Sequence, residues 1–282
     1  MLTTSNDTRI VVLAGKRYAL ERDWGRLPPQ FAKAMVSQIA VDSRGNVHCF
    51  KRGDPPVIVY RPDGEFLGSY GEGSIADAHG IYIDPHDRVF LVDRDAHQLI
   101  ACTTDGQELF RLGTRHTPQW EQPFNHPTDA ATAADGEIYV SDGYANARVH
   151  RFSPDGRLLG SWGAVGQGPG QFMCPHAVWI DAKDRVLVVD RENDRVQLFD
   201  REGGWLEEWR GLCRPMDIYI DADGISYVTD QVPSLSAFAP DGRLLGRCRP
   251  SLNGAHGIFG DAAGNLFLAE IQPSCVTRMR LL

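Results

Sequence analysis

The stretch TDAATAADGEIYVSDGYANARVHRFSPDGRLLGSWG, residues 128–163, carries the pattern that decides the fold. It holds four short runs rich in Val, Ile, Leu, Tyr and Phe, separated by polar turns such as Asp135-Gly136 and Asp155-Gly156. β-Branched and aromatic residues favour strands, and Asp-Gly between two such runs is a strong signal for a tight antiparallel turn. The stretch is therefore predicted to form one four-stranded antiparallel sheet.

The same frame of runs and turns recurs along the whole chain. Alignment of the copies on the first apolar run gives one residue at the start of each innermost strand: Ser37, His79, Thr128, His176, Met216 and His256. An interval of about 40 to 50 residues with four strands per copy is typical of the blades of a β-propeller. We predict an all-β chain that forms a single six-bladed β-propeller domain over residues 1–282.

The last copy ends one strand short at the C-terminus. The segment RYALERDWG, residues 17–25, is similar to the outer strand GRLLGSWG of other copies. We therefore expect the N-terminal strand to complete the sixth blade, because a closed ring leaves no long exposed strand edge. An open sandwich would explain neither the interval between copies nor the unpaired first strand.

Composition narrows the classes of function. The net charge is −8 at pH 7 and no run of Lys and Arg occurs, so we expect no nucleic-acid partner and a small-molecule one instead. No apolar stretch approaches the roughly 18 residues of a membrane span, and the start MLTTSNDTRIVVLAG lacks a secretory pattern. We expect a cytoplasmic protein with no membrane partner. The six cysteines form no CxxC pair and are expected to be reduced thiols.

Histidine occupies the first inner-strand position in every second blade, as His79, His176 and His256. Alternate blades of a sixfold ring are related by about 120°, so these side chains can converge on the central axis. Three neutral imidazoles around one point suit Zn²⁺ with an open fourth position, although Fe, Co or Ni is also compatible with such a site. A single histidine here could instead cap a strand, but three in strict alternation predict a metal site.

The loops after the second strands should lie on the same face as these histidines. The loop reads KRGD in blade one (51–54) and SDGYANAR in blade three (141–148). Arg52 could hold a substrate carboxylate through a bidentate pair, and Tyr144 could transfer a proton. A solvated turn arginine and a packing tyrosine are the alternatives.

Four further residues fall near this face in the aligned copies: Asp129, Asp217, His126 and Cys174. The two aspartates could orient a metal-binding histidine, bind a second cation, or accept hydrogen bonds from free amides at the strand start. His126 lies in a loop that leads to the same rim. Cys174 is expected to be a buried thiol rather than a ligand.

The repeats resemble NHL repeats, and the segments FNHPTDA, VSDGYANARVHRFSPDGRLLGSWG, GPGQFMCPHAV and VVDRENDRVQLFD resemble the catalytic core of peptidyl-α-hydroxyglycine α-amidating lyase. The resemblance covers most of the chain and is strongest over residues 124–200. It implies a six-bladed propeller with a zinc ion held by three histidines. It also implies an active-site arginine and tyrosine. The matching residues are His79, His176, His256, Arg52 and Tyr144.

The chain departs from the family pattern at several positions. A family disulfide would join positions 125 and 145, where this chain has Asn125 and Ala145. The family's structural calcium takes two backbone carbonyls, here those of Ile39 and Ile81, and an Asp after the third histidine, where this chain has Gly257. Retention of a structural Ca²⁺ is therefore left open.

A further departure concerns the substrate. The family's active-site methionine, two residues before the third histidine, is replaced by Gly254. The 282 residues also contain no copper monooxygenase segment, so we do not expect a role in peptide-hormone processing.

These residues favour a zinc-dependent lyase that cleaves the C–N bond of an α-hydroxyglycine-type amide or a related hemiaminal. The products would be an amide or amine and a carbonyl compound such as glyoxylate. A metal-dependent hydrolase or lactonase on the same propeller is the first alternative, and a non-catalytic NHL interaction module is the second.

Overall fold

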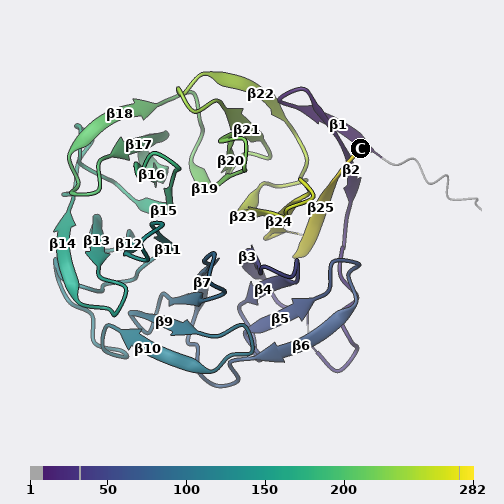
Figure 1. The fold of residues 1–282 in the computed structure, drawn as a ribbon, viewed down its shortest axis with the longest axis horizontal. Coiled ribbons are helices and arrows are strands. Elements are labelled where there is room, and N and C mark those ends of the chain that lie inside the picture. Colours follow the sequence, from purple (N-terminus) through teal and green to yellow (C-terminus); the bar gives the residue numbers. More distant parts are fainter. Residues whose placement is uncertain (1–8, 32, 273) are drawn as a thin grey trace, which may run out of the picture.

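The computed structural model describes residues 9–31, 33–272 and 274–282. Its strands form six antiparallel sheets that surround a central axis like the blades of a propeller (Figure 1). The predicted all-β six-bladed propeller is confirmed. In every blade the innermost strand begins within one residue of the aligned position of the repeat.

Blades one to three each consist of four strands, with consecutive strands as hydrogen-bonded neighbours. Blade one contains β3 (Val36–Val41), β4 (Val47–Lys51), β5 (Val57–Tyr60) and β6 (Phe66–Tyr70). Blade two contains β7 (Ala78–Ile83), β8 (Val89–Asp93), β9 (Gln98–Cys102) and β10 (Glu108–Leu112). Blade three contains β11 (Asp129–Thr132), β12 (Ile138–Asp142), β13 (Arg148–Phe152) and β14 (Leu158–Trp162).

Blades four and five repeat this arrangement. Blade four contains β15 (Pro175–Ile180), β16 (Val186–Asp190), β17 (Arg195–Phe199) and β18 (Trp205–Trp209), with the 3-10 helix η1 (Arg191–Asn193) after its second strand. Blade five contains β19 (Pro215–Ile220), β20 (Ser226–Asp230), β21 (Leu235–Phe238) and β22 (Leu244–Cys248). Over the described residues, the structure contains no helix with the length and apolar character needed to cross a membrane.

Blade six joins the two ends of the chain. It contains β23 (Ala255–Gly260), β24 (Leu266–Glu270), β25 (Cys275–Leu281), β2 (Lys16–Glu21) and β1 (Ile10–Leu13). Strand β2 pairs antiparallel with β25, and the register joins Tyr18 to Leu281. The N-terminal segment therefore completes the last blade, as predicted. Strand β1 was not predicted: it folds back on β2 through Ala14 and Gly15, both with positive φ, and makes a fifth strand.

An aspartate after the innermost strand shapes the first turn of each blade except the third. In blade one, Asp42 Oδ1 accepts hydrogen bonds from the backbone N–H groups of Arg44 and Asn46. Gly45 lies between them with φ of +81°, a conformation that glycine adopts without steric cost. The equivalent acceptors are Asp84, Asp181, Asp221 and Asp261. These short turns hold the inner two strands of a blade in register.

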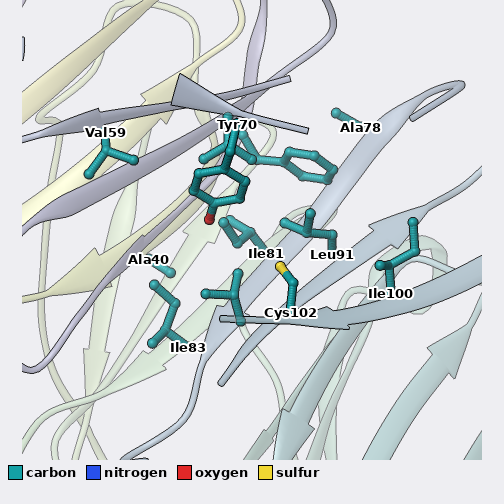
Figure 2. Packing of buried hydrophobic residues seen from close by; sticks show 12 residues of the cluster. Ala40, Val59, Tyr70, Ala78, Ile81, Ile83, Leu91, Ile100 and Cys102 are labelled. Atoms are coloured by element: carbon teal, nitrogen blue, oxygen red, sulfur yellow. The ribbon is translucent and has the colours of Figure 1, made fainter. Parts of the chain in front are cut away.

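The hydrophobic core consists of layers between adjacent blades rather than one central mass. The second strands are buried along their whole length, as in β8, whereas outer strands such as β10 are exposed or half-buried. Figure 2 shows the layer between blades one and two, where Tyr70, Val59 and Ala40 pack against Ile81 and Leu91. Because each inner strand packs between two such layers, the residues at the strand starts are held around the axis.

Candidate metal centre

The structure brings the three aligned histidines together on the axis. His79, His176 and His256 are each the second residue of an innermost strand, β7, β15 and β23. Their ring centroids are 4.9 Å apart in all three pairs. One nitrogen of each lies within 4.8 Å of the others, and the side chains are buried. Among the described residues this is the only group of at least three His, Cys, Asp or Glu side chains spaced for a metal ion.

Each imidazole is oriented by a backbone carbonyl of the following blade. The Nδ1–H groups of His79, His176 and His256 donate to the carbonyl oxygens of Thr128, Met216 and Ser37, at 2.6, 2.6 and 2.8 Å. A proton on Nδ1 leaves the lone pair on Nε2, which faces the axis, and such partners fix the orientation of metal-binding histidines. The alternation of the repeat thus has a physical meaning, because histidine blades supply ligands and the intervening blades supply acceptors.

The three imidazoles are held in the neutral form that binds metals. Burial lowers the pKa of His256 to about 4, even though its bond to Ser37 acts in the opposite direction. Burial, followed by the charges of the other histidines, lowers the pKa of His79 and of His176 well below the ordinary value. Neutral Nε2 atoms are therefore available as ligands near pH 7.

Tyr144 lies over the open side of this triangle. Its side chain comes from the loop between β12 and β13 and is partly exposed. The hydroxyl oxygen is 3.1 Å from His79 Nε2 and 3.2 Å from His176 Nε2. An O–H group at this position faces the place where a fourth ligand or a substrate oxygen would lie.

Two arginines that sequence reasoning did not single out flank this tyrosine. The guanidinium carbons of Arg94 and Arg191 lie 5.4 and 5.3 Å from the Tyr144 ring centroid, and Arg191 Nη1 donates to its hydroxyl at 3.3 Å. Both follow directly after the last residue of a second strand, as Arg52 does. That shared register is a sequence signal that would have found them.

Arg52 and Arg94 are held by a common carboxylate beside the histidines. Arg52 Nε lies 3.1 Å from Asp77 Oδ1 and donates to the Ala78 carbonyl at 3.3 Å. Arg94 Nη2 lies 3.0 Å from Asp77 Oδ2. The charge of Arg52 also contributes to the lowered pKa values of all three histidines. The rim therefore carries three guanidinium groups on the sides of blades one, two and four, and their carboxylate partners are Asp77, Asp95 and Glu192.

The opposite side of the rim is uncharged and hollowed. A cavity of about 230 Å³ lies between blades five and six. Its lining residues are Met216, Gln231, Asn253, Gly254, Ala255, His256, Ile271 and Gln272. Gly254 has φ of +90°, and a Cβ there would lie 2.7 Å from the Gln231 carbonyl oxygen. The backbone thus favours glycine at the position of the family's methionine, and the space stays open.

The two candidate aspartates lie one residue further along the inner strands. Asp129 Oδ2 accepts a hydrogen bond from Val178 N at 3.2 Å, and Asp217 Oδ2 accepts one from Ile258 N at 2.7 Å. Both carboxyls are buried, and burial raises the pKa of Asp217 to about 7. Each aspartate therefore ties its own blade to the next one through a backbone amide.

The structural calcium that the family resemblance implies does not fit this layer. Gln38 Nε2 donates to Asp217 Oδ2, and the Gln38 Oε1 atom overlaps the position of a Cβ at Gly257. The space of an acidic side chain after the third histidine is thus filled by an amide from blade one. We derive no role for calcium.

The remaining candidates lie apart from the metal-ligating atoms. His126 Nδ1 bonds to Asn125 Oδ1, and its backbone carbonyl accepts a bond from Tyr144 N at 3.4 Å, so it supports the tyrosine loop. Cys174 is buried, and burial raises the pKa of its thiol to about 11. No disulfide forms among the described cysteines, which are all free thiols.

Comparisons with known proteins agree with the fold and find relatives that include proteins named as amidating lyases. A family model described as a six-bladed β-propeller matches residues 129–221. Human NHL repeat-containing protein 3 is 30% identical over 244 residues, which cover 81% of this chain and 65% of that protein. A probable peptidyl-α-hydroxyglycine α-amidating lyase of Caenorhabditis elegans is 25% identical over 304 residues, with 92% of this chain and 86% of that protein covered. The chain thus spans just under two thirds of the human relative.

Among solved structures, a gluconolactonase from Xanthomonas campestris superposes with a TM-score of 0.70 at 18% identity, over 99% of this chain and 96% of that one. This likeness concerns the fold alone. The chain is a six-bladed β-propeller whose homologues include NHL repeat-containing proteins and amidating lyases.

Proposed function

We propose that this protein is a metal-dependent carbon–nitrogen lyase that acts on an α-hydroxyglycine-type amide or a related hemiaminal. The observation that carries the proposal is the contact of the Tyr144 hydroxyl with two of three converging imidazole Nε2 atoms, at 3.1 and 3.2 Å. The similarity to a probable amidating lyase supports the same reaction class.

His79, His176 and His256 would hold the metal. Their buried neutral imidazoles and carbonyl-bound Nδ1–H groups fit Zn²⁺, and the same donors also accept Fe, Co or Ni. When bound, the ion would supply Lewis acidity towards a substrate oxygen.

Tyr144 would act as the proton-transfer group. Cleavage of R–CO–NH–CH(OH)–COO⁻ requires loss of the hydroxyl proton, formation of the C=O bond and breakage of the C–N bond. The departing nitrogen gains one proton, so the products are R–CO–NH₂ and glyoxylate, with no water consumed. The phenol faces the open side of the histidine triangle, where it can give its own proton to the departing nitrogen as it takes the hydroxyl proton.

The arginine side of the rim would bind the substrate carboxylate. Arg52 and Arg94, fixed by Asp77, and Arg191, bonded to Tyr144, all present guanidinium groups near the centre. A planar guanidinium pairs with a carboxylate through two parallel hydrogen bonds and so fixes its orientation. The substrate partner is therefore a small molecule that bears a carboxylate.

The uncharged cavity between blades five and six would receive the departing amide. Its polar groups are the side-chain amides of Gln231, Asn253 and Gln272, and it adjoins His256. Side-chain amides both donate and accept hydrogen bonds, which suits an amide or urea leaving group better than a charged amine.

The proposal is tested with enzyme of measured metal content and a panel of N-acyl-α-hydroxyglycines and ureidoglycolate. We expect glyoxylate release from at least one substrate, and a loss of about 100-fold or more in turnover for Tyr144→Phe with metal content unchanged. No glyoxylate from any substrate with stoichiometric metal would overturn the proposal.

A hydrolase or lactonase is the second candidate, because three imidazole ligands with an open side also suit the activation of water. Ring opening of lactones by the metal-loaded protein, without glyoxylate release from the first panel, would favour it. A non-catalytic NHL interaction module would need neither metal nor turnover. The cytoplasmic location stays a prediction of the sequence, to be checked by fractionation.

A further inference from the structure

A second cavity lies between blades one and six, apart from the candidate metal centre. Its walls are mainly apolar and include Trp24, Leu27, Val36, Ile58, Tyr60 and Val276. Its volume is about 80 Å³. Because one water needs roughly 10 to 15 Å³, the cavity has room for several water-sized groups. The cavity shares no lining residue with the cavity around the three histidines.

One cation is buried in this apolar wall. Lys51, the last residue of β4, lines the cavity and is only 3% exposed. Arg52, the next residue, reaches Asp77 and Ala78 of blade two, and Lys51 lines the cavity towards blade six. Lys51 therefore takes no part in the arginine side of the rim.

The Lys51 amine has no counter-ion within ion-pair distance among the residues that the structure describes. Among the described residues, the carboxylate that affects the pKa of Lys51 is that of Asp54. It acts through its charge and makes no hydrogen bond to the amine. Asp54 Oδ1 instead accepts a bond from Gly73 N at 3.0 Å. The carboxylate of Asp23 at the cavity lies 3.9 Å from Lys33 Nζ, a lysine whose side chain is 77% exposed. Burial of the Lys51 amine also lowers its pKa.

Lysines that are almost fully buried are nearly always paired, and Lys51 lines the cavity with no ion-pair partner among the described residues. An apolar cavity beside it favours hydrocarbon. A molecule with a carboxylate head and a short apolar body would supply both a partner for the Lys51 amine and hydrocarbon to fill the cavity. We propose that the cavity between blades one and six is a binding site for a short-chain carboxylate whose head group pairs with Lys51.

The inference is independent of the proposed lyase activity, and its test uses no substrate. The full chain has four lysines, Lys16, Lys33, Lys51 and Lys183, so selective ¹³C labelling at lysine Cε gives few resonances. The Lys51 resonance is identified by its absence from Lys51→Met. The probe is hexanoate, added to metal-free protein so that an ion at the histidines cannot bind it.

We expect hexanoate to shift the Lys51 resonance along a saturable one-site curve, while the other lysine resonances stay in place. 1-Hexanol, which has the same chain and no charge, should bind about tenfold or more weakly, because it lacks the charge-assisted hydrogen bond. Calorimetry should show the same loss for hexanoate with Lys51→Met. The matched control Lys33→Met removes an exposed lysine at the same cavity and should bind hexanoate as the wild type does.

An unmoved Lys51 resonance at saturating hexanoate would overturn the proposal, and this measurement needs only the wild-type protein. Equal affinity of the wild type and Lys51→Met for hexanoate would also overturn it. Equal affinity for hexanoate and 1-hexanol would show a purely apolar cavity and reject the carboxylate head group. Loss of glyoxylate release in the lyase assay has no bearing on any of these outcomes.

Discussion

The Nδ1 atom of His256 lies 2.8 Å from the carbonyl oxygen of Ser37, although 219 residues separate the two in the chain. Ser37 and His256 hold the same position of the repeat in blades one and six. The bond therefore forms across the closure of the ring, where the C-terminal blade meets the first one. Orientation of this ligand depends on closure of the propeller.

Replacement of His176 by Ala should remove most bound metal from the purified protein, to about a tenth of the wild-type content, because two imidazoles hold a divalent ion much more weakly than three. Elemental analysis after dialysis measures this. The control is His126→Ala, which changes a histidine near the same rim that does not face the axis. Equal metal loss in both variants would contradict the assignment of ligands.

Replacement of Arg52 by Lys should raise the KM for a carboxylate substrate about tenfold or more and change kcat less. Lysine keeps the charge but loses the planar fork that pairs with a carboxylate. Steady-state kinetics on the best substrate of the panel measures the split. The penalty should vanish for an analogue with a neutral amide in place of the carboxylate. Arg210→Lys, at a side chain that is 61% exposed, serves as the control and should leave both constants unchanged.

Replacement of Gly257 by Ala should destabilise the fold by about 1 to 3 kcal/mol, because the new Cβ would overlap Gln38 Oε1 and lie 2.9 Å from Gln38 Cα. Denaturant unfolding measures the change. Gly160→Ala is the control, since nothing lies within 4 Å of a Cβ at that outer-strand position. An unchanged free energy of unfolding for Gly257→Ala would show that the layer below the histidines is loosely packed.

Replacement of Glu137 by Gln should lower the melting temperature at pH 7 by about 2 to 4 °C. A hydrogen bond from Arg151 is the largest cause that lowers the pKa of Glu137, and burial acts in the opposite direction. With a further hydrogen bond from Arg201, the pKa falls to about 2 from an ordinary value of 4.5. A lowered folded pKa stabilises the native state above pH 4.5, and this stabilisation is lost as the pH falls towards 2. Melting curves of wild type and variant should therefore converge on acidification. Glu65→Gln, at a pair whose side chains are 51% and 63% exposed, should show no difference at any pH.

Much of the fold could be predicted from the sequence because each blade is built from contacts between residues that are close in the chain. A blade needs four short strands and tight turns, and the turn aspartates such as Asp42 and Asp84 act within four residues of themselves. Strand β1 escaped the repeat alignment because it lies outside any copy. Its pairing with β2 depends only on the hairpin at Ala14 and Gly15.

Part of the candidate site could also be predicted from the sequence. His79, His176 and His256 share a repeat position, so their meeting point follows from the symmetry of a ring. Arg94 and Arg191 were missed because an arginine in a loop is usually solvated, and only the packing of blades two and four against Tyr144 gives these two a role. Gln38 was missed because its partners Asp217 and Gly257 lie on two other blades.

By itself, the sequence determined the number of blades, the strand that closes the ring and the alternation of histidines, since these depend on periodicity along the chain. Only the tertiary structure decided which carbonyl orients each imidazole, which arginines face Tyr144 and why the position after the third histidine is glycine. These features are contacts between blades, and they depend on distances between residues that are far apart in the sequence. The Lys51 amine, which has no ion-pair partner among the described residues, belongs to the same class, because the cavity beside it lies where the last blade meets the first.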